Sequence, residues 1–251
     1  MNNLNNNLNN NLTNDLTNSL TNNSTSPTTT SAPNSLLPNS SLPNSAFVEK
    51  FLDGVQEIVA RLDRNSLDRA IESLFAAWQR GGTIFICGNG GSASTAQHMA
   101  CDLFKCTITP GQPRLRAVSL VDNVPLLSAL TNDDGWDKVY EEQLKTLFHP
   151  GDVVLAISVH GGNGKDKAGL WSQNLLRALR YAQDNGGTAM GFSGFDGGAM
   201  MDICDVCVVV PYNTTPHVEA FHVVLHHLVT FCLAEKIRAH KRVTHAASSI
   251  S

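Results

Sequence analysis

The stretch that decides the fold is Thr83-Ile84-Phe85-Ile86-Cys87-Gly88-Asn89-Gly90-Gly91-Ser92. A short apolar run, typical of a buried strand, is followed at once by a glycine turn, and a helical pattern begins directly after it. Strand, turn and helix in this order open a βα unit. We therefore expect a parallel sheet, because neighbouring parallel strands are joined by crossover helices.

The same alternation continues along the chain. Four further apolar runs are predicted strands: 115–121, 153–158, 188–192 and 206–210. Helical patterns are expected near 123–131, 137–147, 171–185 and 216–238, and two amphipathic patterns precede the first strand. We predict an α/β fold, a three-layer sandwich with a five-stranded parallel sheet of the flavodoxin-like or Rossmann-like kind. In such folds ligands bind beyond the carboxyl ends of the strands.

Composition divides the 251 residues into a tail and a body. Residues 1–45 contain 15 Asn, a single charge at Asp15 and no aromatic residue. Their apolar content is too low to offset the entropy of ordering, so the prediction is a disordered tail, with a weak self-association segment as the alternative. The folded domain is expected over residues 46–240, followed by a short flexible tail over 241–251.

Charge and cysteine content indicate which kinds of partner and which cellular compartment to expect. The formal net charge is −4, which disfavours a nucleic-acid binder. No run of about 18 apolar residues indicates a membrane span, and no secretory signal is present. We expect a cytoplasmic protein, because the six cysteines suggest no disulfide framework. Cys204 and Cys207 form a lone C-x-x-C that runs into a strand, which favours burial over a redox or zinc site.

Two glycine-rich turns that follow strands are candidate anion sites. In the first, over 88–94, free amide groups at a helix N-terminus and serine hydroxyls would suit a phosphate. The alternatives there are a plain tight turn or a dinucleotide site, since Gly88, Gly90 and Ala93 fit G-x-G-x-x-A. Asp122 would then meet a ribose, although it lies further on than the usual spacing of about 20 residues. The second turn, over 158–165, is a candidate because its exposed amides, with Lys165 at its end, could bind an anion.

Ionisable residues cluster on two predicted helices. His98 and Asp102 are four apart and share a helix face, so they could hold a metal or form an acid/base pair. Four histidines and Glu219 lie within residues 217–227 of an otherwise apolar helix. Such a helix rarely carries so many ionisable groups without partners. The cluster is interpreted as functional, with a histidine-rich subunit contact as the alternative.

Five motifs in this order resemble the sugar isomerase (SIS) domain family, and most closely its phosphoheptose isomerases. They are Gly88–Ser92 with Gln97-His98, Thr131-Asn132-Asp133, Gly151–Ser158, Gly194–Gly198, and Val218-Glu219 with His222. The resemblance covers roughly residues 46–238. It implies a homotetramer with sites at subunit interfaces, and conversion of sedoheptulose 7-phosphate into D-glycero-D-manno-heptose 7-phosphate through an enediol. It also implies a divalent metal, usually zinc.

The resemblance assigns roles to residues. Asp102 is the expected base and His227 the expected acid, and the expected metal ligands are His98, Asp102, Glu219 and His227. The expected substrate-binding residues are Asn89, Gly90, Gly91, Ser92, Asn132, Asp133, Ser158, His160, Asn163, Lys165 and Glu219. Asp102 and Glu219 stand where the family has glutamate and glutamine, and the 158–164 loop lacks two of the family's serine hydroxyls.

Two other functions are compatible with the sequence. One is a non-catalytic member of the same family that binds a sugar phosphate or a protein partner. The other is a dinucleotide enzyme that uses the first glycine turn. Retention of ionisable residues at 102, 219 and 227 favours the isomerase.

Overall fold

The computed structural model describes residues 43–162 and 172–248, with side chains described as far as residue 240. Residues 1–42, 163–171 and 249–251 lie outside this part of the chain. Most of the predicted disordered tail therefore falls outside the described residues, as do Asn163 and Lys165. Their assignments stay predictions.

Five parallel strands form the single sheet of the described chain and confirm the predicted fold class. They are β1 (Thr83–Gly88), β2 (Arg116–Ser119), β3 (Val153–Ile157), β4 (Thr188–Gly194) and β5 (Val206–Val210). The strand order is β2-β1-β3-β4-β5, and every neighbouring pair is parallel. All residues of β1 and β3 are buried, because helices cover both faces of the sheet.

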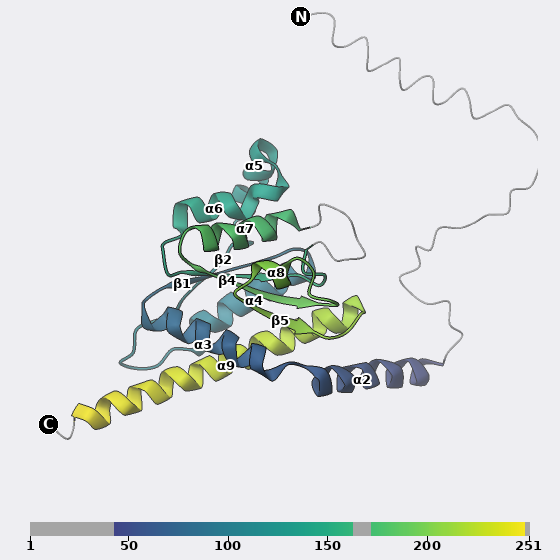
Figure 1. Cartoon of the computed structure of the whole chain (residues 1–251), viewed down its shortest axis with the longest axis horizontal. Helices are drawn as coiled ribbons and strands as arrows, with labels where there is room; N and C mark the ends of the chain where they lie inside the picture. Colours follow the sequence, from purple (N-terminus) through teal and green to yellow (C-terminus); the bar gives the residue numbers. More distant parts are fainter. Residues whose placement is uncertain (1–42, 163–171, 249–251) are drawn as a thin grey trace, which may run out of the picture. The chain divides into compact units, whose positions relative to one another are not determined.

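Helices form the two outer layers (Figure 1). One layer contains α3 (Arg64–Gln79), α4 (Gly91–Cys106) and α9 (Thr215–Ser248), and the other contains α6 (Val139–Leu147) and α7 (Gln173–Asp184). Alternate strand residues face the two cores: Ile84 and Ile86 pack with α3 and α4, whereas Phe85 packs with α6 and α7. The remaining elements are α2 (Asn44–Arg61), α5 (Val124–Asp134), the 3-10 helix η1 (Trp136–Lys138) and α8 (Met200–Ile203).

The last helix is longer than its sequence pattern predicts. The pattern ends near residue 238, but α9 stays helical to Ser248, so the backbone of the predicted 241–251 tail begins as helix. By length and composition, Thr215–His240 is also apolar enough to cross a membrane. However, 56% of its most apolar window is buried within the fold. Packing against α3, α4 and the sheet accounts for its apolar composition.

The strand order determines where a ligand would bind. β1 continues into α4 on one face of the sheet, whereas the chain that leaves its neighbour β3 leads to α7 on the opposite face. A crevice opens at such a switch point, beyond the carboxyl ends of the two strands. Both predicted anion-binding turns begin there.

Candidate functional site

The turn after β1 depends on glycine. A Cβ on Gly88 would lie 2.4 Å from the Ser92 carbonyl oxygen, so only glycine lets the backbone fold back this tightly. Gly90 is the N-cap of α4 and has a φ of 57°, a left-handed conformation that favours glycine. The turn therefore places Asn89 and Ser92 at the crevice. The amides of Ser92, Ala93 and Ser94 donate to carbonyls within the turn.

A cavity of about 140 Å³ lies between this turn and the loop after β3. Its lining residues are Asn89, Ser92, Ile157, Ser158, Val159, His160, Gly162, Ser172, Leu175 and Glu219. The structure thus brings five predicted substrate-binding residues together at one cavity. Its volume is below the roughly 300 Å³ of pockets that hold a whole small molecule. The cavity suits one end of a substrate, such as a phosphate group.

Two residues that the sequence did not single out hold Asn89 in place. The side-chain amides of Asn89 and Asn174 donate to each other's oxygens, at 3.0 and 2.8 Å. The Tyr140 hydroxyl donates to the Gly88 carbonyl at 2.7 Å. An asparagine on the buried face of the amphipathic α7 is the signal that could have revealed Asn174.

The loop after β3 is held by a second glycine turn. Gly161 has a φ of 62°, and a Cβ there would lie 1.9 Å from the Gly197 carbonyl oxygen. The Met200 amide at the start of α8 donates to the Gly161 carbonyl at 2.9 Å. The cavity wall on this side therefore depends on close backbone contact between two loops.

Other predicted residues lie elsewhere. Asn132 and Asp133 are exposed on α5, where the Asn132 amide donates to Asp133 Oδ1 at 2.7 Å. Among the described residues they are not part of the cavity lining. Gly90 and Gly91 belong to the turn itself and are likewise not part of the cavity lining.

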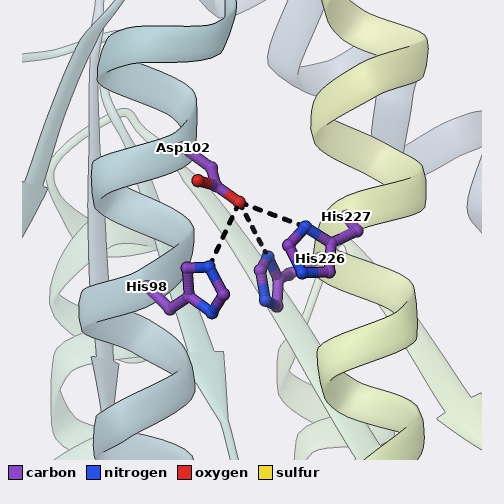
Figure 2. A group of neighbouring side chains, drawn as sticks. All are labelled: His98, Asp102, His226 and His227. Atoms are coloured by element: carbon purple, nitrogen blue, oxygen red, sulfur yellow. Dashed lines mark ion pairs between the residues drawn. The ribbon is translucent and has the colours of Figure 1, made fainter.

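Four ionisable side chains meet where α4 and α9 lie side by side (Figure 2). His98 and Asp102 come from α4, and His226 and His227 from α9. Asp102 Oδ2 lies 3.1 Å from His227 Nδ1, 3.6 Å from His98 Nε2 and 3.8 Å from His226 Nδ1. We call these four residues the histidine–aspartate cluster. It contains both predicted catalytic residues and three of the four predicted metal ligands.

The cluster has the chemistry of a divalent-metal site. One possible ligand atom from each residue lies within 4.8 Å of the others. Burial, together with the nearby His227 and His98, lowers the pKa of His226 to about 4. His226 is therefore neutral at pH 7, which is the form of imidazole that binds metals. Imidazole nitrogens and a carboxylate oxygen suit zinc.

Glu219, the fourth predicted ligand, is not a member of the cluster. It lies seven residues before His226, which is about 10 Å along the helix axis. Its carboxylate instead faces the first residue of α4, where a Cβ on Gly91 would lie 2.8 Å from Glu219 Oε1. The structure therefore places Glu219 at the cavity.

The other two histidines of the 217–227 segment have structural partners. His217 Nε2 donates to the Phe51 carbonyl at 3.0 Å, and its Nδ1 contacts the Thr214 hydroxyl at 2.6 Å. His222 Nε2 donates to the Ser193 carbonyl at 3.1 Å. The histidine-rich segment thus divides into an anchoring pair and a pair at the cluster. His226 joins the cluster although the resemblance assigned it no role.

His222 makes stability depend on pH. Its burial lowers its pKa from 6.5 to about 4, so the unfolded state binds more protons between these values. The stabilisation is complete above about pH 6.5 and is lost as the pH falls towards 4, by at most about 3 kcal/mol. We expect His222→Gln to remove this part of the pH dependence in denaturant unfolding. Parallel curves for the two proteins would contradict the assignment.

Comparison with known proteins places the chain in a family. The SIS domain model matches residues 46–166. The lincomycin biosynthesis protein LmbN of Streptomyces lincolnensis is 41% identical over 191 residues, which cover 74% of this chain and 68% of that protein. The phosphoheptose isomerase of Aliarcobacter butzleri is 34% identical over 187 residues, covering 73% and 93% respectively.

A solved structure shows the same relationship. The phosphoheptose isomerase of Neisseria gonorrhoeae matches with a TM-score of 0.67 at 28% identity, over 76% of this chain and 97% of that one. The strand order is flavodoxin-like and differs from the 3-2-1-4-5-6 order of the classical dinucleotide-binding fold. The chain belongs to the SIS domain family, within the branch that includes the phosphoheptose isomerases.

Proposed function

We propose that the chain is an aldose–ketose isomerase that converts sedoheptulose 7-phosphate into D-glycero-D-manno-heptose 7-phosphate. The observation that carries this proposal is the Asp102 Oδ2 to His227 Nδ1 contact of 3.1 Å, on the same helix pair as the cavity. A carboxylate and an imidazole at this distance are the two proton-transfer groups that an isomerisation needs. Their presence favours an enzyme over a non-catalytic sugar-phosphate binder.

The two parts of the site are separated along α4. Ser92 at the cavity and His98 at the cluster are six residues apart, which corresponds to about 9 Å of helix. An extended seven-carbon phosphate carries its phosphate and its reacting carbons at opposite ends. Phosphate bound at the cavity would therefore hold C1 and C2 towards the cluster, which reduces the entropy lost in reaching the transition state.

The reaction requires proton transfers only. Asp102 removes a proton from C1 of the open-chain ketose, and the electrons of that bond form the C1–C2 double bond of an enediol. His227 gives a proton to the carbonyl oxygen at C2. Asp102 then returns its proton to C2 while His227 takes the proton from the C1 hydroxyl, and an aldose results. Base and acid end in their starting states.

We propose zinc as the metal, held with the participation of His98, Asp102 and His227. When bound, such an ion would polarise the sugar oxygens as a Lewis acid. The choice of zinc is supported by the imidazole and carboxylate donors of the cluster.

We also propose a cytoplasmic homotetramer with sites at subunit interfaces. Exposed apolar side chains flank the cluster on both helices: Phe104 on α4, and Val224, Leu228 and Phe231 on α9. A groove of about 610 Å³ between α4 and β2 has Phe104 in its lining. Covering these side chains with a second copy would bury apolar surface next to the cluster.

The substrate assignment is tested by a panel of sugars. The full chain is incubated with sedoheptulose 7-phosphate, with shorter ketose phosphates and with sedoheptulose itself, and aldose formation is followed by NMR. We expect the heptulose phosphate to react fastest, and kcat/KM to fall more than about tenfold without the phosphate. Equal rates with and without the phosphate would show that phosphate binding at the cavity does not assist the reaction. Faster turnover of a shorter ketose phosphate would change the substrate.

A further inference from the structure

His226 is the most buried member of the histidine–aspartate cluster, and its ring packs against His98 and His227 without a hydrogen bond among the described residues. Its exposed fraction is 0%, and neither ring nitrogen has a hydrogen-bond partner among the described residues. His217 and His222, on the same helix, each make hydrogen bonds within the fold. A buried polar group without a partner is costly, and this cost is normally offset by a ligand or a bonding partner.

We propose that His226 is a ligand of the divalent metal, beside His98, Asp102 and His227. The inference rests on the proposed metal of the isomerase and adds to its expected ligand set. It assigns a ligand role to a residue that the family resemblance did not mark.

The positions of the four side chains fit this ligand set. Ligand atoms 2.0–2.1 Å from a tetrahedral zinc ion lie about 3.3–3.4 Å from one another. The Asp102 Oδ2 distances to the three imidazoles, 3.1, 3.6 and 3.8 Å, bracket that value. Figure 2 shows the three rings grouped around this one oxygen, with His226 between the two helices. The possible ligand atoms lie within 4.8 Å of one another, so the imidazoles would close in on a bound ion.

Glu219 is placed for a different task. Its carboxylate faces Gly91 and lines the cavity with Asn89 and Ser92. Among the described residues, Glu219 is not one of the four whose possible ligand atoms group together. At the cavity, Glu219 can accept hydrogen bonds from sugar hydroxyls.

A ligand at His226 also helps to separate metal binding from proton transfer. Asp102 and His227 exchange protons with the substrate in the proposed reaction, whereas His98 and His226 have no proton-transfer step. These two imidazoles can therefore hold the ion while Asp102 and His227 act on the substrate.

The test compares two substitutions that introduce the same residue. His226→Gln and His222→Gln are made in the full chain, and Zn²⁺ affinity is measured by competition with a chromophoric chelator in the absence of substrate. We expect His226→Gln to weaken Zn²⁺ binding about 10- to 100-fold. His222→Gln replaces a buried histidine of the same helix that lies outside the cluster and bonds the Ser193 carbonyl, so it should change the affinity by no more than about twofold. The reverse pattern, or a wild-type chain that binds no Zn²⁺, would overturn the inference.

A second measurement needs no substitution, in case His226→Gln does not fold. The wild-type chain is loaded with Co²⁺, and exchangeable imidazole N–H protons shifted by the paramagnetic ion are counted by NMR. Three such signals are expected if His98, His226 and His227 all bind, and fewer than three would overturn the site of three imidazoles. Both readouts are independent of turnover, so failure of the isomerase assay leaves them interpretable, and failure here leaves the isomerase assay standing.

Discussion

Asp102→Asn is expected to lower kcat for sedoheptulose 7-phosphate by about three orders of magnitude. Asparagine has nearly the same shape as aspartate but cannot accept a proton from C1, and a positioned base typically contributes 10²- to 10⁴-fold. Asp102 Oδ2 faces all three imidazoles of the cluster. The other three members are histidines, so no second carboxylate of the cluster can replace Asp102. Steady-state kinetics on the folded variant, checked by thermal unfolding, measure the effect.

Asp102→Glu is the matched control. It restores the residue that phosphoheptose isomerases are expected to carry at this position, and it keeps the carboxylate while extending it by one methylene. We expect it to retain far more activity than the asparagine variant. If asparagine supported turnover near the wild-type rate, Asp102 would not be the base.

Gly161→Ala is expected to have the second largest effect. Its φ of 62° already disfavours alanine, and the added Cβ would lie 1.9 Å from the Gly197 carbonyl oxygen. Because the obstacle is backbone, the 158–162 loop or the loop before α8 must move. A displacement of about 1 Å at the cavity wall can lower kcat/KM about 100-fold. The free energy of unfolding should fall by about 3 kcal/mol, as for other severe backbone or packing defects.

Gly81→Ala separates the clash from the backbone strain. Gly81 has a φ of 74°, and a Cβ there would have no described atom within 4 Å of it. Gly81 follows α3 and does not line the cavity. This variant should lose only about 1 kcal/mol and keep its kinetic constants. If both alanine variants had the same kinetics, contact between the two loops would not shape the cavity.

The sheet could be predicted because its strands are continuous apolar runs bounded by glycine turns. Val153–Ile157 is buried at every position, which gives a signal that needs no knowledge of its neighbours. The end of α9 could not be predicted in the same way. Its apolar periodicity fades near residue 238, whereas its backbone continues as helix to Ser248.

The site was only partly predictable for a related reason. The spacing of His98 and Asp102 shows that they share a helix face, but it does not show which turn of α9 lies opposite. That packing brings His226 and His227 to Asp102 and leaves Glu219 beside Gly91. Such a placement depends on contacts between helices more than 100 residues apart in the chain. The Asn89–Asn174 pair was also not predictable, because its two residues come from distant segments of the chain.

The most direct test of the central claim is incubation of the metal-loaded full chain with sedoheptulose 7-phosphate in D₂O, followed by NMR. An isomerase that works through an enediol should produce the aldoheptose 7-phosphate with deuterium at C2, because the proton held by Asp102 can exchange with solvent before it returns. The Asp102→Asn chain should produce neither the aldose nor the exchange. Absence of aldose and of deuterium incorporation with the wild-type chain would contradict the proposed activity.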